Sequence, residues 1–136
     1  MIIHLDTNTA IGLLNGKPES HRDEYERARA SDDVFVSSIV VFELWYGVAH
    51  SARFEQNAGA LRKFLGTLSD VLPFTDEDAA LAGDIRATLR KAGTPIGPYD
   101  LLIAAQAVRN SATLVTANTV EFARVPGLQW QEWPKS

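Results

Sequence analysis

The most informative absence from this 136-residue chain is cysteine, because a protein without thiols has neither disulfide bonds nor thiolate metal ligands. Histidine is scarce as well. His4, His21 and His50 are the only three, and no two of them have the spacing of a metal-binding pair. A metal site built on thiolates is therefore excluded, and nothing indicates one built on histidines. The lack of cysteine fits a reducing cytoplasm, where we expect the protein to act.

Long hydrophobic runs and several familiar motifs are also missing. No uncharged apolar stretch approaches the roughly 18 residues needed to cross a bilayer. The first residues have neither the basic segment nor the apolar length of a signal peptide, so we expect no membrane association. The glycines are not followed by the Gly-Lys-Ser/Thr of a phosphate-binding loop, and the nucleophile elbow of a Ser-His-Asp hydrolase is absent.

The overall composition is that of an ordinary globular protein, with 46% hydrophobic and 22% charged residues. There is no internal repeat and no flexible linker, so we expect residues 1–136 to form a single domain. The net charge of −4 argues against indiscriminate binding to nucleic acid. It does not exclude a nucleic-acid substrate, because a metal-binding cluster of carboxylates itself lowers the net charge.

The hydrophobic pattern alternates short apolar runs with longer amphipathic segments. Strands are expected over residues 2–5, 34–36, 71–74, 113–116 and 128–133. Helices are expected over residues 7–15, 19–30, 39–49, 54–68, 76–91 (capped by Asp76) and 98–110, with a helical turn over 120–123. Alternating strands and helices favour an α/β fold with a mostly parallel sheet covered on both faces. The order of the strands does not follow from this pattern.

Three acids stand where strands end or the next helices begin. Asp6 follows the first strand, Glu43 lies in an otherwise apolar helix, and Asp100 lies in the first turn of a later helix. The polar residues Thr116 and Asn118 follow the fourth strand. In a parallel sheet these groups approach one edge, where mutual repulsion of the acids would be costly without a cation. Oxygen ligands alone indicate Mg²⁺ or Mn²⁺, ions that activate water and neutralise phosphate charge in phosphodiester hydrolysis.

Each acid also has a plainer interpretation. Asp6 would serve as the cap of the first helix, and Asp100 would interact favourably with a helix dipole. Glu43 is harder to explain in this way, because an ionised carboxylate among apolar neighbours needs a cation, a partner or a route to solvent.

Four stretches, in this order along nearly the whole chain, resemble the PIN-domain ribonucleases. They are Leu5-Asp6-Thr7-Asn8, Ser38 to Gly47, Pro95 to Ala105 and Val115 to Gly127, and the last two narrow the resemblance to the VapC toxins of bacterial type II toxin–antitoxin systems. The resemblance implies a three-layer α/β/α sandwich and Mg²⁺-dependent endoribonuclease activity, commonly on tRNA. It also implies a toxin homodimer and a cognate antitoxin whose C-terminal segment blocks the active site.

The resemblance assigns roles to individual residues. Asp6, Glu43 and Asp100 match the acidic active-site positions, with Asp6 and Asp100 as the direct metal ligands. Glu43 would orient or deprotonate the attacking water, which would leave a 5′-phosphate and a 3′-hydroxyl. Thr116 matches a hydroxyl position beside the site, and Asn118 stands where many members have a fourth acid.

Asn118 brings no charge, so we expect one firmly held metal and a second that needs the substrate's phosphate. Glu121 lies one helical turn further along, where the simpler expectation is a side chain that faces solvent.

Two alternative functions differ from this one in the residues they need. A phosphoacceptor switch domain would need an aspartate at the end of the third strand and a lysine at the end of a later one. The chain instead has Pro73-Phe74-Thr75 and Thr116-Ala117-Asn118 at these places. A catalytically silent PIN-like binding module would have no need of Asp6, Glu43 and Asp100 together.

Overall fold

Five strands and seven helices occupy residues 1–135, the part of the chain that the computed structural model describes. The strands are β1 (Ile2–Leu5), β2 (Asp33–Ser37), β3 (Asp70–Leu72), β4 (Thr113–Val115) and β5 (Gln129–Gln131). The helices are α1 (Thr7–Asn15), α2 (Ser20–Ser31), α3 (Ser38–Ala49), α4 (Phe54–Thr67), α5 (Asp76–Lys91), α6 (Pro98–Arg109) and α7 (Thr119–Phe122). Within these residues, no helix combines the length and hydrophobicity that crossing a membrane requires.

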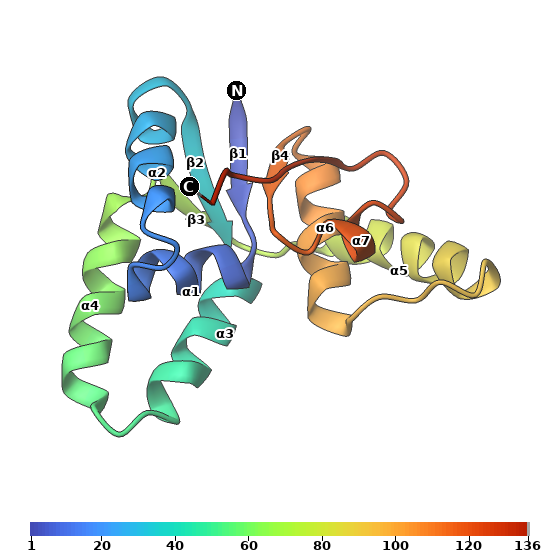
Figure 1. Ribbon diagram of the computed structural model, residues 1–136. Helices are drawn as coiled ribbons and strands as arrows, with labels where there is room; N and C mark the ends of the chain where they lie inside the picture. Colours follow the sequence, from blue (N-terminus) through green and yellow to red (C-terminus); the bar gives the residue numbers. More distant parts are fainter. Residues whose placement is uncertain (136) are drawn as a thin grey trace.

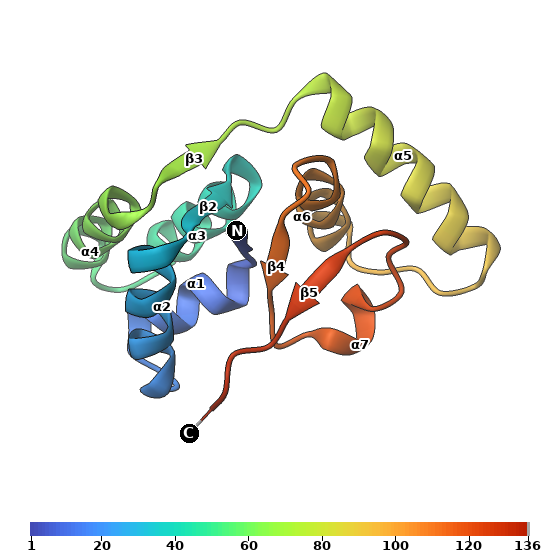
Figure 2. The same cartoon turned by 90° about the horizontal axis from the view of Figure 1, so that it is seen from above.

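The strands form one parallel sheet in the order β3-β2-β1-β4-β5. Helices α1–α4 gather to one side of β1 and α5–α7 to the other in Figure 1, and Figure 2 shows the same arrangement from above. The parallel five-stranded sheet with helices packed around it confirms the expected α/β/α fold. The chain builds outward from β1 to β3 and then returns to add β4 on the opposite side of β1. Ligands bind at such a switch point, beyond the carboxyl ends of the strands.

The register between β1 and β4 fixes what lies at the switch point. Leu5 stands opposite Val115, and the backbone N–H of Asp6 donates to the Val115 carbonyl at 3.2 Å. The two strands therefore end side by side. As a result, Asp6 and Thr116 lie next to each other just beyond the ends of these strands, although they are 110 positions apart in sequence.

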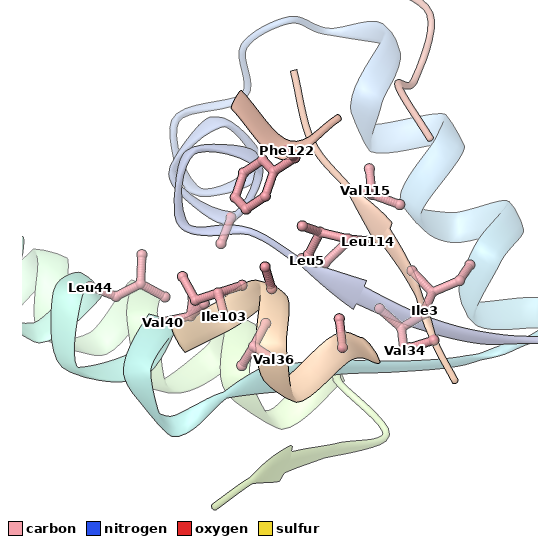
Figure 3. Close-up of a cluster of buried hydrophobic side chains, with 14 of the residues drawn as sticks. Ile3, Leu5, Val34, Val36, Val40, Leu44, Ile103, Leu114, Val115 and Phe122 are labelled. Carbon is pink, nitrogen blue, oxygen red and sulfur yellow. The ribbon is translucent and has the colours of Figure 1, made fainter. Parts of the chain in front are cut away.

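A continuous hydrophobic core holds this edge in place (Figure 3). Leu5 of β1 and Leu114 of β4 are fully buried, as are Ile103 of α6 and Phe122 of α7. Complete burial of a leucine or phenylalanine side chain contributes about 1.5–3 kcal/mol. The burial of Phe122 matters most for the site, because it anchors the short helix α7 directly after β4.

Helix α5 begins differently from the prediction. Asp76 is not its cap, because Thr75 fills that position. The Asp78 N–H donates to Thr75 Oγ1 at 3.3 Å, and the Thr75 N–H donates to Asp78 Oδ2 at 2.8 Å. This reciprocal capping box leaves Asp76 as the first helical residue. The other oxygen of the buried Asp78 accepts from Arg109 Nη1 at 2.9 Å, which joins α5 to α6.

Three strands, β3, β4 and β5, are shorter than predicted, and in β3 and β5 the residues expected at the end of the strand have other partners. The third strand was expected over residues 71–74, but the Phe74 N–H donates to Ser38 Oγ at 3.0 Å and lies outside the sheet. The last strand also ends early. Trp133 leaves the sheet and packs edge-on against His21, with ring centroids 5.6 Å apart.

His4, in the middle of β1, gives the fold a pH-dependent stability. Its ring is fully buried, with Nε2 3.2 Å from Asn110 Nδ2 and Nδ1 unpartnered among the described residues. Burial lowers the pKa of His4 from 6.5 to about 4, against a smaller opposing effect from Asp78. The unfolded chain therefore binds the proton more readily. The contribution of His4 to the free energy of unfolding is fully present above pH 6.5 and is lost as the pH falls toward 4.

We predict that titration of His4 lowers the free energy of unfolding by about 2 kcal/mol when the pH is lowered from 7 to 5. The measurement is urea unfolding of the wild type and of His4→Asn at both pH values. The pH dependence should be smaller in the variant by that amount. His50→Gln, which removes an exposed histidine, should retain the full dependence. An equal pH dependence in wild type and His4→Asn would contradict the prediction.

Candidate active site

Asp6 caps the first helix, and its carboxylate also contacts Thr116 at the end of β4. Its side chain is only 2% exposed at the end of β1. Oδ1 accepts from the Thr9 N–H at 2.8 Å and caps α1, whereas Oδ2 accepts from Thr116 Oγ1 at 2.5 Å. Thr116 Oγ1 in turn accepts from the Asn118 N–H at 2.9 Å. The carboxylate is thus held from both sides, and each of its oxygens retains a further acceptor site.

Glu43 reaches the same region from α3. Ser37 caps the start of this helix, and its Oγ accepts from the Ile39 N–H at 3.0 Å. Val40 and Leu44, four residues apart, are buried against the core and fix the rotation of the helix. Glu43 is half-buried beside them and accepts at Oε1 from Thr7 Oγ1 at 2.5 Å. The partner that its apolar setting required is therefore the hydroxyl of the first residue of α1.

Asp100 occupies the first turn of α6, which begins at Pro98. Its pKa is raised from 3.8 to about 6. Desolvation is the largest cause, and the negative charges of Asp6, Glu121 and Glu43 add to it, while the Asn118 amide acts in the opposite direction. The electrostatic effect of three other acids indicates that carboxylates from four elements share one region.

Glu121 is the member of this cluster that the sequence did not reveal. The expectation that it faces solvent is wrong, because its half-buried carboxylate bridges two segments. Oε1 accepts from the Gly97 N–H at 3.2 Å, and Oε2 accepts from Asn118 Nδ2 at 2.6 Å. The one available signal was the spacing of three between Asn118 and Glu121, which places both on one side of a helical turn. Glu121 thereby ties α7 to the loop that precedes Asp100.

The donor atoms of the cluster suit a hard divalent cation. Carboxylate oxygens are the ligands that Mg²⁺ prefers, and a cation would relieve the repulsion that raises the pKa of Asp100. Among residues 1–135, no group of three or more His, Cys, Asp or Glu side chains is arranged closely enough to hold one ion. Mg²⁺ commonly takes only one or two protein carboxylates and completes its shell with water and substrate phosphates. The residues present therefore fit an ion held in that way.

Comparison with known proteins agrees with this architecture. The PIN domain family matches residues 3–128. The chain is 39% identical over 135 residues to the ribonuclease VapC2 of Rickettsia felis. This alignment covers 99% of this chain and 100% of the relative. It is 38% identical over 129 residues to the tRNA(fMet)-specific endonuclease VapC of Salmonella typhimurium, covering 95% and 96% of the two chains.

Solved structures give the same result. The fold matches that of VapBC2 from Rickettsia felis bound to a DNA fragment from its promoter, with a TM-score of 0.93, 38% identity, and coverage of 98% of this chain and 100% of the other. The DNA-bound VapBC from Salmonella typhimurium follows with a TM-score of 0.91, 36% identity, and coverage of 98% and 99%. The fold and the sequence together define a PIN domain, and the chain belongs to this family. Among its relatives within the family are VapC ribonucleases.

The electrostatics of the cluster can be tested in the metal-free protein. We predict that Glu121→Gln lowers the pKa of Asp100 from about 6 toward 3.8, because the substitution removes one of the negative charges that raise it. The glutamine retains an oxygen that can accept from the Gly97 N–H. The measurement is a carboxyl ¹³C NMR titration of Asp100. Glu132→Gln, at an exposed position near the C-terminus, serves as the matched control and should leave this pKa unchanged.

Proposed function

We propose that the protein is a Mg²⁺-dependent endoribonuclease and the toxin of a type II toxin–antitoxin system. The observation that carries the proposal is the gathering of Asp6, Glu43, Asp100 and Glu121 at the switch point between β1 and β4. An acidic centre at this place in an open α/β sheet is suited to a divalent cation and a phosphate ester. Membership of the PIN domain family supports the same reaction.

The metal is proposed to bind at Asp6 and Asp100, with Glu43 as the third acid of the set. When bound, Mg²⁺ supplies positive charge against the phosphate oxygens and lowers the pKa of the attacking water. Mn²⁺ has the same preference for oxygen ligands and can substitute. Because Asn118 adds no charge, a second ion would depend on the substrate's own phosphate.

The chain's own residues position the reacting groups. Thr116 Oγ1 holds Asp6 at 2.5 Å, and Thr7 Oγ1 holds one oxygen of Glu43 at 2.5 Å. The other oxygen of Glu43 accepts a proton from the attacking water. The water oxygen bonds to phosphorus in line with the departing 3′-oxygen, and the P–O3′ bond breaks. The products are a 5′-phosphate and a 3′-hydroxyl, the latter protonated from solvent.

The proposed substrate is tRNA, and cleavage would inhibit translation in the cytoplasm. None of the steps requires the 2′-hydroxyl, so the support for RNA comes from relatives, among them the tRNA(fMet)-specific endonuclease of Salmonella typhimurium. The solved VapBC complexes support a cognate antitoxin as partner, and we propose that its C-terminal segment blocks the site. We also propose that the toxin forms a homodimer and that the dimer assembles with the antitoxin into a hetero-oligomer.

Substitution of Asp6 tests the catalytic centre. We predict that the purified protein cuts RNA in Mg²⁺ to give 5′-phosphate ends, and that EDTA or Asp6→Asn lowers the rate at least about 100-fold. Asparagine caps helices as well as aspartate does, so the variant should keep its fold by circular dichroism. Asp84→Asn, at an exposed position on α5, is the matched control and should cut at the wild-type rate. Undiminished cleavage by folded Asp6→Asn protein would refute the proposal.

A second experiment addresses the substrate and the antitoxin in cells. We predict that expression of the wild type arrests growth and that sequencing of 5′-monophosphate ends maps new cuts to tRNA. The neighbouring reading frame should encode a small basic antitoxin, and its expression together with the toxin should restore growth and remove the cuts. Asp6→Asn should produce neither effect. Cuts confined to messenger RNA would refute tRNA as the substrate while leaving the ribonuclease assignment intact.

A further inference from the structure

Two aromatic rings lie in contact beside the acidic cluster and remain open to solvent. Phe42 of α3 is 52% exposed and Tyr99 of α6 is 46% exposed. Their ring centroids are 5.5 Å apart and their planes are inclined by 61°, an edge-to-face arrangement. A single exposed aromatic side chain is common, whereas a pair in contact next to a functional site is informative.

Each ring belongs to the residue that immediately precedes an acid of the site. Phe42 precedes Glu43, and Tyr99 precedes Asp100. Successive side chains on a helix point about 100° apart, so each ring flanks its acid instead of competing with it for the same space. A substrate whose phosphate is held by these acids can therefore place a neighbouring base over the two rings.

The charge of the protein makes uncharged contacts with RNA important. The chain has a net charge of −4, and the site itself is a concentration of carboxylates. Release of counterions by basic side chains, the usual source of affinity for nucleic acid, is correspondingly limited. Stacking of a base on an aromatic ring requires no charge and contributes about 5- to 100-fold in affinity. Aromatic stacking is also the usual means of binding unpaired RNA bases.

The size of the exposed surface favours a base over a protein partner. Two half-exposed aromatic side chains offer on the order of 200 Å². A stable protein interface needs about 800 Å² from each partner. The Phe42–Tyr99 pair is therefore too small to hold a protein by itself, but it is large enough for one or two bases.

We propose that Phe42 and Tyr99 form a stacking platform that holds a base next to the scissile phosphate of an unpaired RNA segment. The inference rests on the proposed ribonuclease function. It adds a positioning role for two residues outside the acidic cluster, and it makes the enzyme selective for unpaired over paired RNA.

The test uses Phe42→Ala and Tyr99→Ala, with Phe42→Trp and Tyr99→Phe as variants that retain a ring. The substrates are a short single-stranded RNA that the wild type cuts and the same RNA with abasic nucleotides flanking the cut. Each alanine variant should raise KM for the intact RNA about 5- to 100-fold with a smaller change in kcat. The ring-retaining variants should keep KM near the wild-type value. The abasic RNA should raise KM for the wild type but not further for the alanine variants.

A control variant and three contrary outcomes make the stacking platform falsifiable. Phe54→Ala removes an aromatic ring that is 46% exposed at the start of α4, and it should leave KM unchanged. If the wild type cuts RNA but the alanine variants keep its KM, the platform is refuted and the ribonuclease function stands. If the wild type cuts no RNA, the proposed function itself fails. An altered oligomeric state by light scattering, together with insensitivity to abasic substitution, would identify a protein contact and overturn the inference.

Discussion

The parallel pairing of β1 with β4 is the constraint on which the rest of the site depends. The register that sets Leu5 against Val115 also sets Asp6 beside Thr116, and a slip of one residue would turn every side chain of a strand to the opposite face. The fully buried Leu5 and Leu114 fix that register through the core, so the same packing that stabilises the sheet also places the Asp6 carboxylate. The other acids of the cluster lie on helices that pack on the same sheet, and these helices position them near Asp6.

The site concentrates negative charge, and the fold compensates with hydroxyl and amide donors. Thr116, Thr7 and Asn118 each donate to a carboxylate of the cluster. The compensation is incomplete, because the pKa of Asp100 stays near 6. Protonation of Asp100 therefore favours the folded metal-free protein as the pH falls from about 6 toward 3.8, whereas protonation of His4 opposes it between 6.5 and about 4. The two residues have opposite effects over nearly the same range of pH.

The sequence anticipated the local features well and the long-range ones only through resemblance. The helix that contains Glu43 and the strand that ends at Asp6 follow from hydrophobic periodicity, which is a property of neighbouring residues. Periodicity carries no information on the order of the strands, so the direct pairing of β1 with β4 had to come from the structure. The contact between Glu121 and Gly97 was missed for the same reason, since it joins residues 24 positions apart, with α6 and β4 between them in the chain. Thr75 caps α5 through a reciprocal pair of hydrogen bonds with Asp78. The composition of this segment did not favour Thr75 over Asp76 as the cap.

The order in which the sheet is built has a consequence for the protein's synthesis. The first three strands and their helices are complete by residue 72, yet they supply only Asp6 and Glu43. Asp100, Thr116 and Glu121 join the cluster only when the last third of the chain returns to insert β4 beside β1. A chain that is still being made, or one that has lost its C-terminal third, has half of the acidic cluster, and its strand β1 is paired only with β2. The complete acidic cluster therefore exists only in a chain that has been synthesised through β4 and α7, and a truncated product lacks it.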